Sequence, residues 1–357
     1  MTKILAPGDT VGILGGGQLG RMLALAAARL GLNCHIFEPQ PSPPAGQVAH
    51  RVTTADYDDH AALRAFAGSV DVVTFEFENI PLGVLDTIES VTNIYPPQKA
   101  LAVSQDRVAE KGFLTDLGFQ VAPYAPVDTP ADFDAAVAIT GTPAILKTRR
   151  FGYDGKGQLK VTEEAISDAL RDLMQSAPCV LESFVDFTRE ISVIGARNPD
   201  GQVACFDPGE NVHKNGILST TTVPAQLTAA QRTDAVILTG RIMNALNYVG
   251  VMGVELFVTP AGLLVNEIAP RVHNSGHWTQ NGCVIDQFEQ HIRAVAGWPM
   301  GDARRHSNVT MTNLIGNAVQ DIDGLRGDPD VALHLYGKAE VRAGRKMGHS
   351  NRITGPA

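Results

Sequence analysis

Two glutamates in the second half of the chain have the type and spacing that suit a metal ion. Residues 251–259 and 263–268 form β-rich runs, separated by Pro, Ala and Gly at positions 260–262. A three-residue hairpin loop takes a type I turn followed by a residue in the left-handed region, and these residues fit those positions in order. That register predicts Glu255 directly opposite Glu267, with the two Cβ atoms about 5 Å apart on one face.

Two carboxylates at this separation repel each other by about 3 kcal/mol at an effective dielectric constant of about 20. Either one of them is protonated or a cation lies between them. Mg²⁺, with Mn²⁺ as a possible substitute, bridging nucleotide phosphates is the usual arrangement. The alternative is a two-residue loop, which would put Glu255 and Glu267 on opposite faces and dissolve the pair.

A second feature is a glycine-rich loop that follows a short strand at 144–147, which ends on Lys147. The loop consists of Gly152, Tyr153, Asp154, Gly155, Lys156, Gly157 and Gln158. Its glycines let the backbone fold over an anion, to which Lys147 and Lys156 offer positive charge. The alternative is a plain hairpin turn around positions 154–155. Upstream, Arg107 and Lys111 are four residues apart and share a helical face.

A third feature is a G-x-G-x-x-G pattern at residues 15–20, between an expected strand at 10–14 and an expected helix at 19–30. Glu38 ends the next strand, where a ribose-binding carboxylate would lie in a nicotinamide-cofactor domain. The motif is not specific to a nicotinamide cofactor, because the N–H groups of a helix N-terminus preceded by glycines can bind any phosphate. The motif therefore predicts phosphate binding with an undecided ligand, and a tight strand-to-helix turn is the alternative.

Composition limits the class of protein. The chain has 357 residues and a formal net charge of −9, so a nucleic-acid or membrane-surface role is disfavoured. With 44% hydrophobic and 19% charged residues it has enough apolar material for large cores. No secretory leader or membrane span is evident, which predicts a cytoplasmic protein.

The expected elements indicate an α/β and α+β architecture. Further strands are expected at 33–37, 70–75 and 91–95, which together with 10–14 predict a parallel, doubly wound sheet. Residues 95–97, Tyr-Pro-Pro, mark a boundary. The middle of the chain, to about residue 298, is richer in strands with helices between them, and the last part has the alternation of mostly short strands.

With these features in this order, the chain resembles the ATP-grasp ligases, and among them those that use ATP and bicarbonate in microbial purine biosynthesis. The segments that carry the resemblance are 17–22 (GQLGRM), 74–79 (TFEFEN), 152–158, 266–271 (NEIAPR), 273–277 (HNSGH), 336–338 (YGK) and 344–349 (GRKMGH). The resemblance implies an N-terminal Rossmann-like domain at 1–97, an ATP-grasp domain of two α+β lobes at 98–297 and a small β-rich C-terminal domain at 298–357. It also implies ATP-dependent carboxylation of an aminoimidazole ribonucleotide through carboxyphosphate.

The resemblance assigns roles to residues of this chain. The expected nucleotide contacts are Arg107, Lys147, the 152–158 loop, Glu182, Ser183, Phe184, Val185, Glu190, His213, Asn266 and Glu267, with Glu255 and Glu267 holding Mg²⁺. The expected contacts of the ribonucleotide are Gly17, Gln18, Leu19, Glu76, Tyr153, Lys156, Asn274, Lys338 and Arg345. Ala269 stands where many ATP-grasp proteins have Asn, so a third protein ligand to the metal is in doubt.

Three residues are expected to act in the chemistry. Arg271 is the candidate for holding bicarbonate and the acyl phosphate, because a guanidinium matches paired oxygens; a structural ion pair is its alternative. Glu76 is expected to orient or deprotonate the substrate amine, or to hold the ribose. Lys156, on the glycine-rich loop, is expected to neutralise charge as the loop closes.

Other functions remain open at this stage. They are a glycinamide ribonucleotide synthetase, a formate-dependent transformylase, an NAD-dependent oxidoreductase built on residues 15–20, and a non-catalytic ATP-binding protein. The resemblance also suggests a homodimer.

Overall fold

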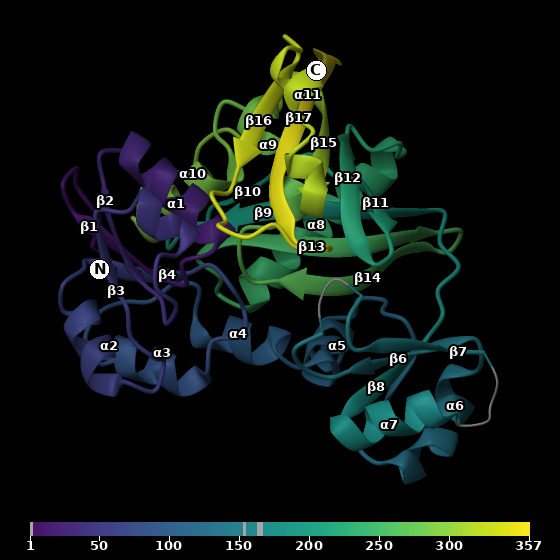
Figure 1. Ribbon diagram of the computed structural model, residues 1–357. Helices are drawn as coiled ribbons and strands as arrows, with labels where there is room; N and C mark the ends of the chain where they lie inside the picture. The colour runs from purple at the N-terminus through teal and green to yellow at the C-terminus, as the bar shows by residue number, and fades with distance from the viewer. Residues whose placement is uncertain (1–2, 153–154, 163–166) are drawn as a thin grey trace.

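The computed structural model describes residues 3–152, 155–162 and 167–357. Within this part of the chain the strands form three sheets. Figure 1 shows the N-terminal sheet on one side of the molecule, the large sheet beside it, and a small lobe that projects below the large sheet.

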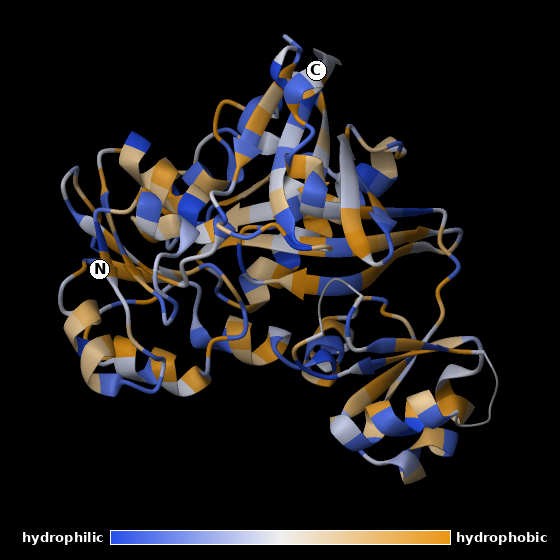
Figure 2. Ribbon diagram, viewed as in Figure 1, coloured by the Kyte–Doolittle hydropathy of each residue, from blue (hydrophilic) through white to orange (hydrophobic). Residues whose placement is uncertain are grey.

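The N-terminal sheet is parallel, with the strand order β3-β2-β1-β4. Its elements are β1 (Thr10–Leu14), α1 (Gln18–Arg29), β2 (Asn33–Phe37), β3 (Arg51–Thr53), α2 (His60–Ala67), β4 (Val72–Phe75) and α3 (Leu82–Glu89). The central strands are almost wholly buried, as expected for a sheet covered on both faces. Figure 2 shows apolar residues along these strands. The prediction of a parallel sheet is confirmed.

The prediction of a strand at residues 91–95 in this sheet is wrong. Residues 91–95 make only an isolated parallel bridge, between Ile94 and Val73. The next residues are Pro96 and Pro97, which have no N–H to continue a ladder. The fourth strand is instead β3, which sequence reasoning missed because it is short and mostly exposed.

The small lobe holds an antiparallel sheet in the order β5-β8-β6-β7. Its elements are β5 (Tyr124–Val127), α6 (Phe133–Thr140), β6 (Ala144–Thr148), β7 (Gln158–Val161), α7 (Asp168–Ser176) and β8 (Cys179–Ser183). Phe133 and Met174 from the two helices are buried with Leu146 and Leu181 of the sheet in one core. The helices α4 (Gln98–Ser104) and α5 (Arg107–Asp116) connect the N-terminal region to this lobe.

The large sheet has nine strands within the described residues, in the order β14-β13-β9-β11-β12-β15-β17-β16, with β10 beside β9. Its strands are β9 (Arg189–Arg197), β10 (Val203–Cys205), β11 (Gly209–Lys214), β12 (Ile217–Val223), β13 (Gly250–Thr259), β14 (Gly262–Ala269), β15 (Ser307–Ile315), β16 (Val331–Leu335) and β17 (Lys346–Pro356). The helices α8 (Ala229–Ala245), α9 (Thr279–Gly282), α10 (Gln287–Val295) and α11 (Asp323–Arg326) complete the fold.

The C-terminal strands differ from the expected short ones. β15 has nine residues and β17 has eleven, and β15 pairs with β12, so the C-terminal segment extends the sheet of the preceding lobe. Because of this continuity, residues between β16 and β17, such as Lys338 and Arg345, line the cavity described below. The proposed domain limits at 97 and 297 stay a prediction. Among the described residues, none of the helices has both the length and the apolar character needed to cross a membrane.

Candidate active site

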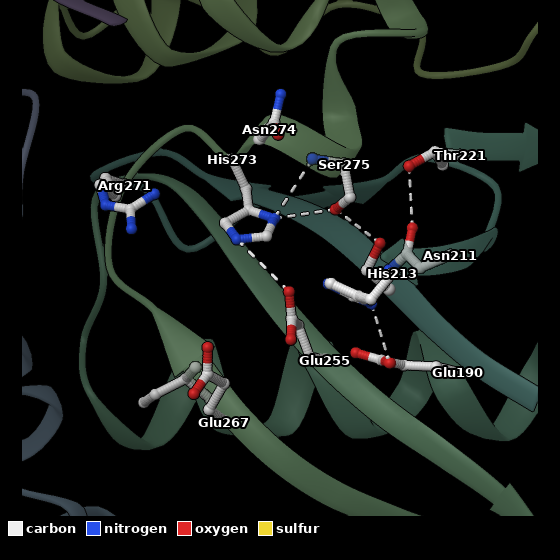
Figure 3. Close-up of polar contacts among 12 residues, drawn as sticks. Glu190, Asn211, His213, Thr221, Glu255, Glu267, Arg271, His273, Asn274 and Ser275 are labelled. Atoms are coloured by element: carbon white, nitrogen blue, oxygen red, sulfur yellow. Dashed lines mark hydrogen bonds and ion pairs between the residues drawn. The ribbon is translucent and has the colours of Figure 1, made fainter. Parts of the chain in front are cut away.

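The hairpin of β13 and β14 places two acidic side chains opposite each other by a route that differs from the expected one. The expected three-residue loop is wrong, because Thr259 pairs with Gly262 and leaves a two-residue loop. Such a loop alone would separate Glu255 from Glu267. A β-bulge at Asn266 adds one residue to β14, and the pairing beyond it sets Glu255 opposite Glu267. The predicted pair therefore forms, and Figure 3 shows both side chains on one side of the hairpin.

The pKa values of Glu255 and Glu267 shift in opposite directions. Burial, followed by the charge of Glu267, raises the pKa of Glu255 well above its usual range. Burial also works to raise the pKa of Glu267, but the Arg107 guanidinium, whose Nη1 lies 3.0 Å from Oε2, outweighs it and lowers that pKa. His273 contacts Glu255, with Nε2 at 3.5 Å from Oε1 (Figure 3). Burial lowers the pKa of His273 to about 3, so this imidazole is neutral and leaves the carboxylate uncompensated.

The donor set of this hairpin fits a hard divalent cation, which prefers carboxylate and amide oxygens. The bulge turns the side chain of Asn266 toward the same cavity as the two carboxylates. Within the described part of the chain, no group of three or more His, Cys, Asp or Glu side chains could hold a metal by itself. A cation at Glu255 and Glu267 would take its remaining ligands from other oxygen atoms, such as those of water or a bound phosphate.

A cluster of cations lies across the cavity, on α5 and β6. The side chain of Asp106 caps α5 by accepting from the N–H groups of Val108 and Ala109, which starts the helix where Arg107 and Lys111 face inward. Lys111 and Lys147 both contact the Glu182 carboxylate, at 3.2 and 2.9 Å.

This contact sets the charge state of Glu182. Burial opposes ionisation, yet Lys147 and Lys111 prevail and lower the pKa of Glu182 to about 2. The second oxygen of this carboxylate, Oε1, is buried without a hydrogen-bond partner. Glu182 is one of the residues that line the cavity.

The glycine-rich turn before α1 is where the sequence predicts a phosphate site. Its backbone N–H groups donate to the chain's own carboxylates: Gly16 to Glu38 at 2.8 Å, and both Gly17 and Gly20 to Glu76, the latter at 2.6 Å. A Cβ on Gly17 would lie 2.6 Å from a Glu76 oxygen, so glycine is required by the close approach of Glu76. In this structure carboxylates of the protein accept from these three donors, and binding of a phosphate at this turn stays a prediction.

The second glycine-rich loop does face the cavity. It joins β6 to β7 as a hairpin, with Lys147 paired with Gln158. Gly152, Gly155, Lys156 and Gln158 line the cavity, whereas Gly157 lies beside Thr148, whose Oγ1 a Cβ would meet at 2.7 Å. The hairpin turn and the anion-binding loop, which were alternatives for this segment, are thus compatible, since a hairpin loop can also cover a ligand. Tyr153 and Asp154 lie outside the described residues.

The three candidate catalytic residues occupy different settings. Arg271 forms a bidentate ion pair with Glu78, with Nη2 at 2.9 Å from Oε1, and it lines the cavity. Glu76 also lines the cavity, but its two oxygens accept from backbone N–H groups, and burial raises its pKa. Lys156 lines the cavity from the loop.

The C-terminal segment contributes basic side chains to the same cavity. Lys338 Nζ donates to the carbonyl of Lys346 at 2.7 Å, and Arg345 Nη1 donates to the carbonyl of Glu340 at 3.1 Å. Asn274, on the loop after β14, exchanges amide hydrogen bonds with Asn313 at 2.7 and 3.0 Å.

These walls enclose a cavity of about 1030 Å³ between the N-terminal sheet, the small lobe and the large sheet. The predicted site residues that line it are Gln18, Leu19, Glu76, Arg107, Lys147, Gly152, Gly155, Lys156, Gln158, Glu182, Ser183, Phe184, Val185, Glu190, His213, Glu255, Asn266, Glu267, Arg271, Asn274, Lys338 and Arg345. Of the predicted residues that the structure describes, Gly17 and Gly157 do not line the cavity.

Sequence reasoning missed an apolar wall of this cavity. Phe187 and Phe257 stack with ring centroids 4.4 Å apart, and Ile145 and Leu218 line the cavity with them. A signal was present for Phe257, because it lies two residues from Glu255 on β13 and so projects from the same face. His273 was also missed as the neighbour of Glu255.

Comparison with known families agrees with this architecture. The model described as ribonucleotide synthetase preATP-grasp domain matches residues 9–105, the ATP-grasp domain model matches 112–288, and the phosphoribosylaminoimidazole carboxylase C-terminal domain model matches 309–355.

Individual relatives match along the whole chain. The N5-carboxyaminoimidazole ribonucleotide synthase of Brucella melitensis is 51% identical over 98% of this chain and 97% of its own length. The structure of N5-carboxyaminoimidazole synthetase from Staphylococcus aureus complexed with ADP has a TM-score of 0.94 and 36% identity, covering 99% of this chain and 95% of that one. The Aspergillus clavatus enzyme in complex with ADP and 5-aminoimidazole ribonucleotide has a TM-score of 0.90 and 29% identity, covering 98% and 94%.

The fold and its cavity define an ATP-grasp carbon–nitrogen ligase. At this level of identity over its full length, the chain belongs to the N5-carboxyaminoimidazole ribonucleotide synthase family.

Proposed function

We propose a division of labour among the cavity residues for the reaction of this family, in which ATP drives the carboxylation of 5-aminoimidazole ribonucleotide by bicarbonate. The products are N5-carboxyaminoimidazole ribonucleotide, ADP and phosphate. The observation that carries the proposal is the opposed Glu255 and Glu267 pair, which faces Lys147 and Lys156 across one cavity. Opposed carboxylates suit a divalent cation, and lysines that line the same cavity suit phosphate oxygens, so together they suit a metal-bound triphosphate.

The nucleotide base is proposed to lie against the apolar wall. Phe184 and the stacked pair of Phe187 and Phe257 offer flat apolar surface to a purine ring. The unpartnered Oε1 of Glu182 suits an exocyclic amino group as donor. Glu190 and His213, which contact each other at 3.1 Å, are proposed to bind the ribose.

The residues proposed to hold Mg²⁺ are Glu255 and Glu267, with phosphate oxygens completing its ligands. The cation would neutralise charge on the phosphates during phosphoryl transfer. Arg107 keeps Glu267 ionised, and Lys147 offers a further positive charge to the transferred group.

Arg271 is proposed to bind bicarbonate and then the acyl phosphate. Bicarbonate attacks the γ-phosphorus of ATP, the bond to the bridging oxygen of ADP breaks, and carboxyphosphate forms. Glu78 holds the Arg271 guanidinium by two nitrogens, so the head group is fixed in orientation before the substrate arrives. The glycine-rich loop with Lys156 is proposed to exclude water, because carboxyphosphate hydrolyses readily.

The aminoimidazole ribonucleotide is proposed to bind between the N-terminal sheet and the C-terminal segment. Gln18, Leu19 and Asn274 line that part of the cavity, and Lys338 and Arg345 suit its 5′-phosphate. The amine attacks the carboxyl carbon of carboxyphosphate, the bond from that carbon to the phosphate oxygen breaks and releases inorganic phosphate, and the amine loses a proton. A role for Glu76 in orienting this amine stays a prediction, because both of its oxygens already bind backbone N–H groups.

The test is ADP release measured with Mg²⁺, bicarbonate and the ribonucleotide all present, and then with each omitted in turn. Full turnover is expected only with all three. ADP release at the same rate without the ribonucleotide would contradict the proposed substrate, and release at the same rate after chelation of Mg²⁺ would contradict the role of the carboxylate pair.

We also propose that the protein is a homodimer and acts in the cytoplasm. Sedimentation at micromolar concentration tests the first, with a monomer mass as the contrary result. Fractionation of the cells that produce it tests the second, where recovery with the membrane or the medium would be contrary.

A further inference from the structure

The strand that carries Glu267 is an edge strand, and residues outside the sheet hold it. β14 is the terminal strand of the large sheet, so the N–H groups on its outer side have no strand to pair with. Two of these outward N–H groups donate to acceptors outside the sheet. Val265 N–H donates to the Gln120 carbonyl at 2.8 Å, and Ile268 N–H donates to Glu110 Oε1 at 2.6 Å.

The spacing of these two hydrogen bonds depends on the bulge. In a regular strand, N–H groups that point to one side recur at every second residue. Val265 and Ile268 are three residues apart, because the extra residue at Asn266 lies between them. The N–H of Ile268 therefore reaches Glu110 in the bulged register, and in a register without the bulge it would point toward β13.

The same choice of register decides which residue faces Glu255. Without the bulge, the pairing that joins Leu256 to Val265 would continue and set Glu255 opposite Asn266. Glu267 would then project from the other face of the hairpin. A hydrogen bond that forms only with the bulge thus favours the register with the two carboxylates together.

We propose that Glu110 is a positioning residue, which selects the bulged register of β14 by accepting from the N–H of Ile268. Glu110 lies one turn after Arg107 on α5, and its side chain is buried, at 2% exposure. One helix then holds Glu267 twice, through its carboxylate by Arg107 and through its neighbouring backbone by Glu110. The inference rests on the proposed role of Glu267 as a metal ligand.

Two substitutions separate the reach of Glu110 from its ionisable carboxyl. Glu110→Gln keeps an oxygen at the same distance and removes the ionisable carboxyl, whereas Glu110→Asp keeps the carboxyl and shortens the side chain by one methylene. We expect kcat of Glu110→Gln to stay within about threefold of wild type and kcat of Glu110→Asp to fall about 10- to 100-fold, as for other residues that orient metal ligands. KM for the ribonucleotide should stay unchanged in both, because the change is confined to the hairpin.

Hydrogen exchange gives a readout without metal, nucleotide or turnover. The amide of Ile268 should be protected in the wild type and in Glu110→Gln, and should exchange faster in Glu110→Asp, while the amide of Val265 stays protected in all three. If Glu110→Asp does not fold, the wild-type chain still decides, since an unprotected Ile268 amide would overturn the inference.

Other outcomes are equally decisive. A loss in Glu110→Gln as large as that in Glu110→Asp would show that an oxygen kept at the same distance is not sufficient, and would overturn the inference. So would full activity in Glu110→Asp. Glu267→Gln is assayed beside them: if it is active, the proposed metal role fails, whereas the exchange of the Ile268 amide still tests the role of Glu110 in the register.

Discussion

Two pairs of glutamates, one beside the turn at the start of α1 and one on the hairpin of β13 and β14, have opposite kinds of partner. Glu38 and Glu76 receive backbone N–H groups from the turn before α1, so their acceptors are satisfied within the chain. Glu255 and Glu267 face each other; Arg107 pairs with Glu267, and the contact of Glu255 is with the neutral imidazole of His273. The first pair completes the structure of a turn. In the second pair, burial and the charge of Glu267 raise the pKa of Glu255, and a bound cation would favour its ionised form.

The comparison shows why a motif does not by itself define a ligand. The G-x-G-x-x-G turn has the donors of a phosphate site, yet in this chain a carboxylate 56 residues away takes the donor at Gly20. In the hairpin, Glu267 pairs with Arg107, whereas Glu255 lies beside the neutral His273 and has a raised pKa. Unsatisfied polar groups, and not glycine patterns, mark the part of this cavity where a charged ligand is expected.

The largest effect is expected from Glu267→Gln. Replacing the carboxylate removes a charge from the proposed cation site, and we expect kcat for ADP release to fall about 1000-fold, the size found when one group that stabilises transition-state charge is lost. Glu89→Gln, at an exposed position at the end of α3, is the control and should keep wild-type turnover. Equal activity in the two variants would remove the distinction between the carboxylate pairs.

Glu76→Gln should act on stability instead. Its side chain accepts from two N–H groups as a charged acceptor, and an amide would turn an NH₂ toward one of them. We expect the free energy of unfolding to fall by about 2 kcal/mol, measured by urea denaturation. The Mg²⁺ dependence of turnover should not change. A thousandfold loss of kcat at wild-type stability would instead place Glu76 in the chemistry.

A buried histidine whose hydrogen bonds are made within the protein should also make the free energy of unfolding depend on pH. His291 accepts from Val251 N–H at 3.0 Å and contacts Thr74 Oγ1 at 2.7 Å, and burial lowers its pKa to about 3. Between pH 6.5 and 3 the unfolded chain therefore binds a proton that the folded chain does not. Stability is fully present above that window and is lost as the pH falls through it, by at most about 1.4 kcal/mol per pH unit for this group.

Urea denaturation between pH 7 and pH 5 measures this dependence. In His291→Gln the unfolding free energy should decline less steeply with acid than in wild type, because one titrating group has been removed. The exposed His306→Gln variant is the matched control. Identical slopes in wild type and His291→Gln would contradict the assignment.

The smallest effect is expected from Glu38→Gln. Glu38 Oε2 accepts from Gly16 N–H at 2.8 Å in a partly exposed setting, where an amide oxygen can serve as well. We expect a loss of about 0.5–1 kcal/mol in unfolding free energy and no change in ADP release. A strong effect on turnover would show that this turn contacts a ligand after all, and would weaken the contrast drawn between the two pairs.

Much of the local structure follows from the residues alone. The strands β1 and β2 form where apolar β-branched and aromatic residues are bounded by Gly, Asp or Asn. The strand ending near Lys147 and the glycine-rich loop after it were also placed correctly, because Gly-rich segments between strands have few alternatives. Errors arose at residues 91–95 and at β3, where the local signal was ambiguous or short.

The sequence by itself determined the carboxylate and lysine content of this site and the hairpin that brings Glu255 near Glu267. Tertiary structure alone decided the bulge that aligns them, the pairing of Glu182 with Lys111 and Lys147, and the closure of the first glycine turn by Glu76. The reason is physical. Turn geometry and hydrophobic alternation act over a few residues, whereas the partner of a buried charge is chosen by the fold from residues far apart in the chain.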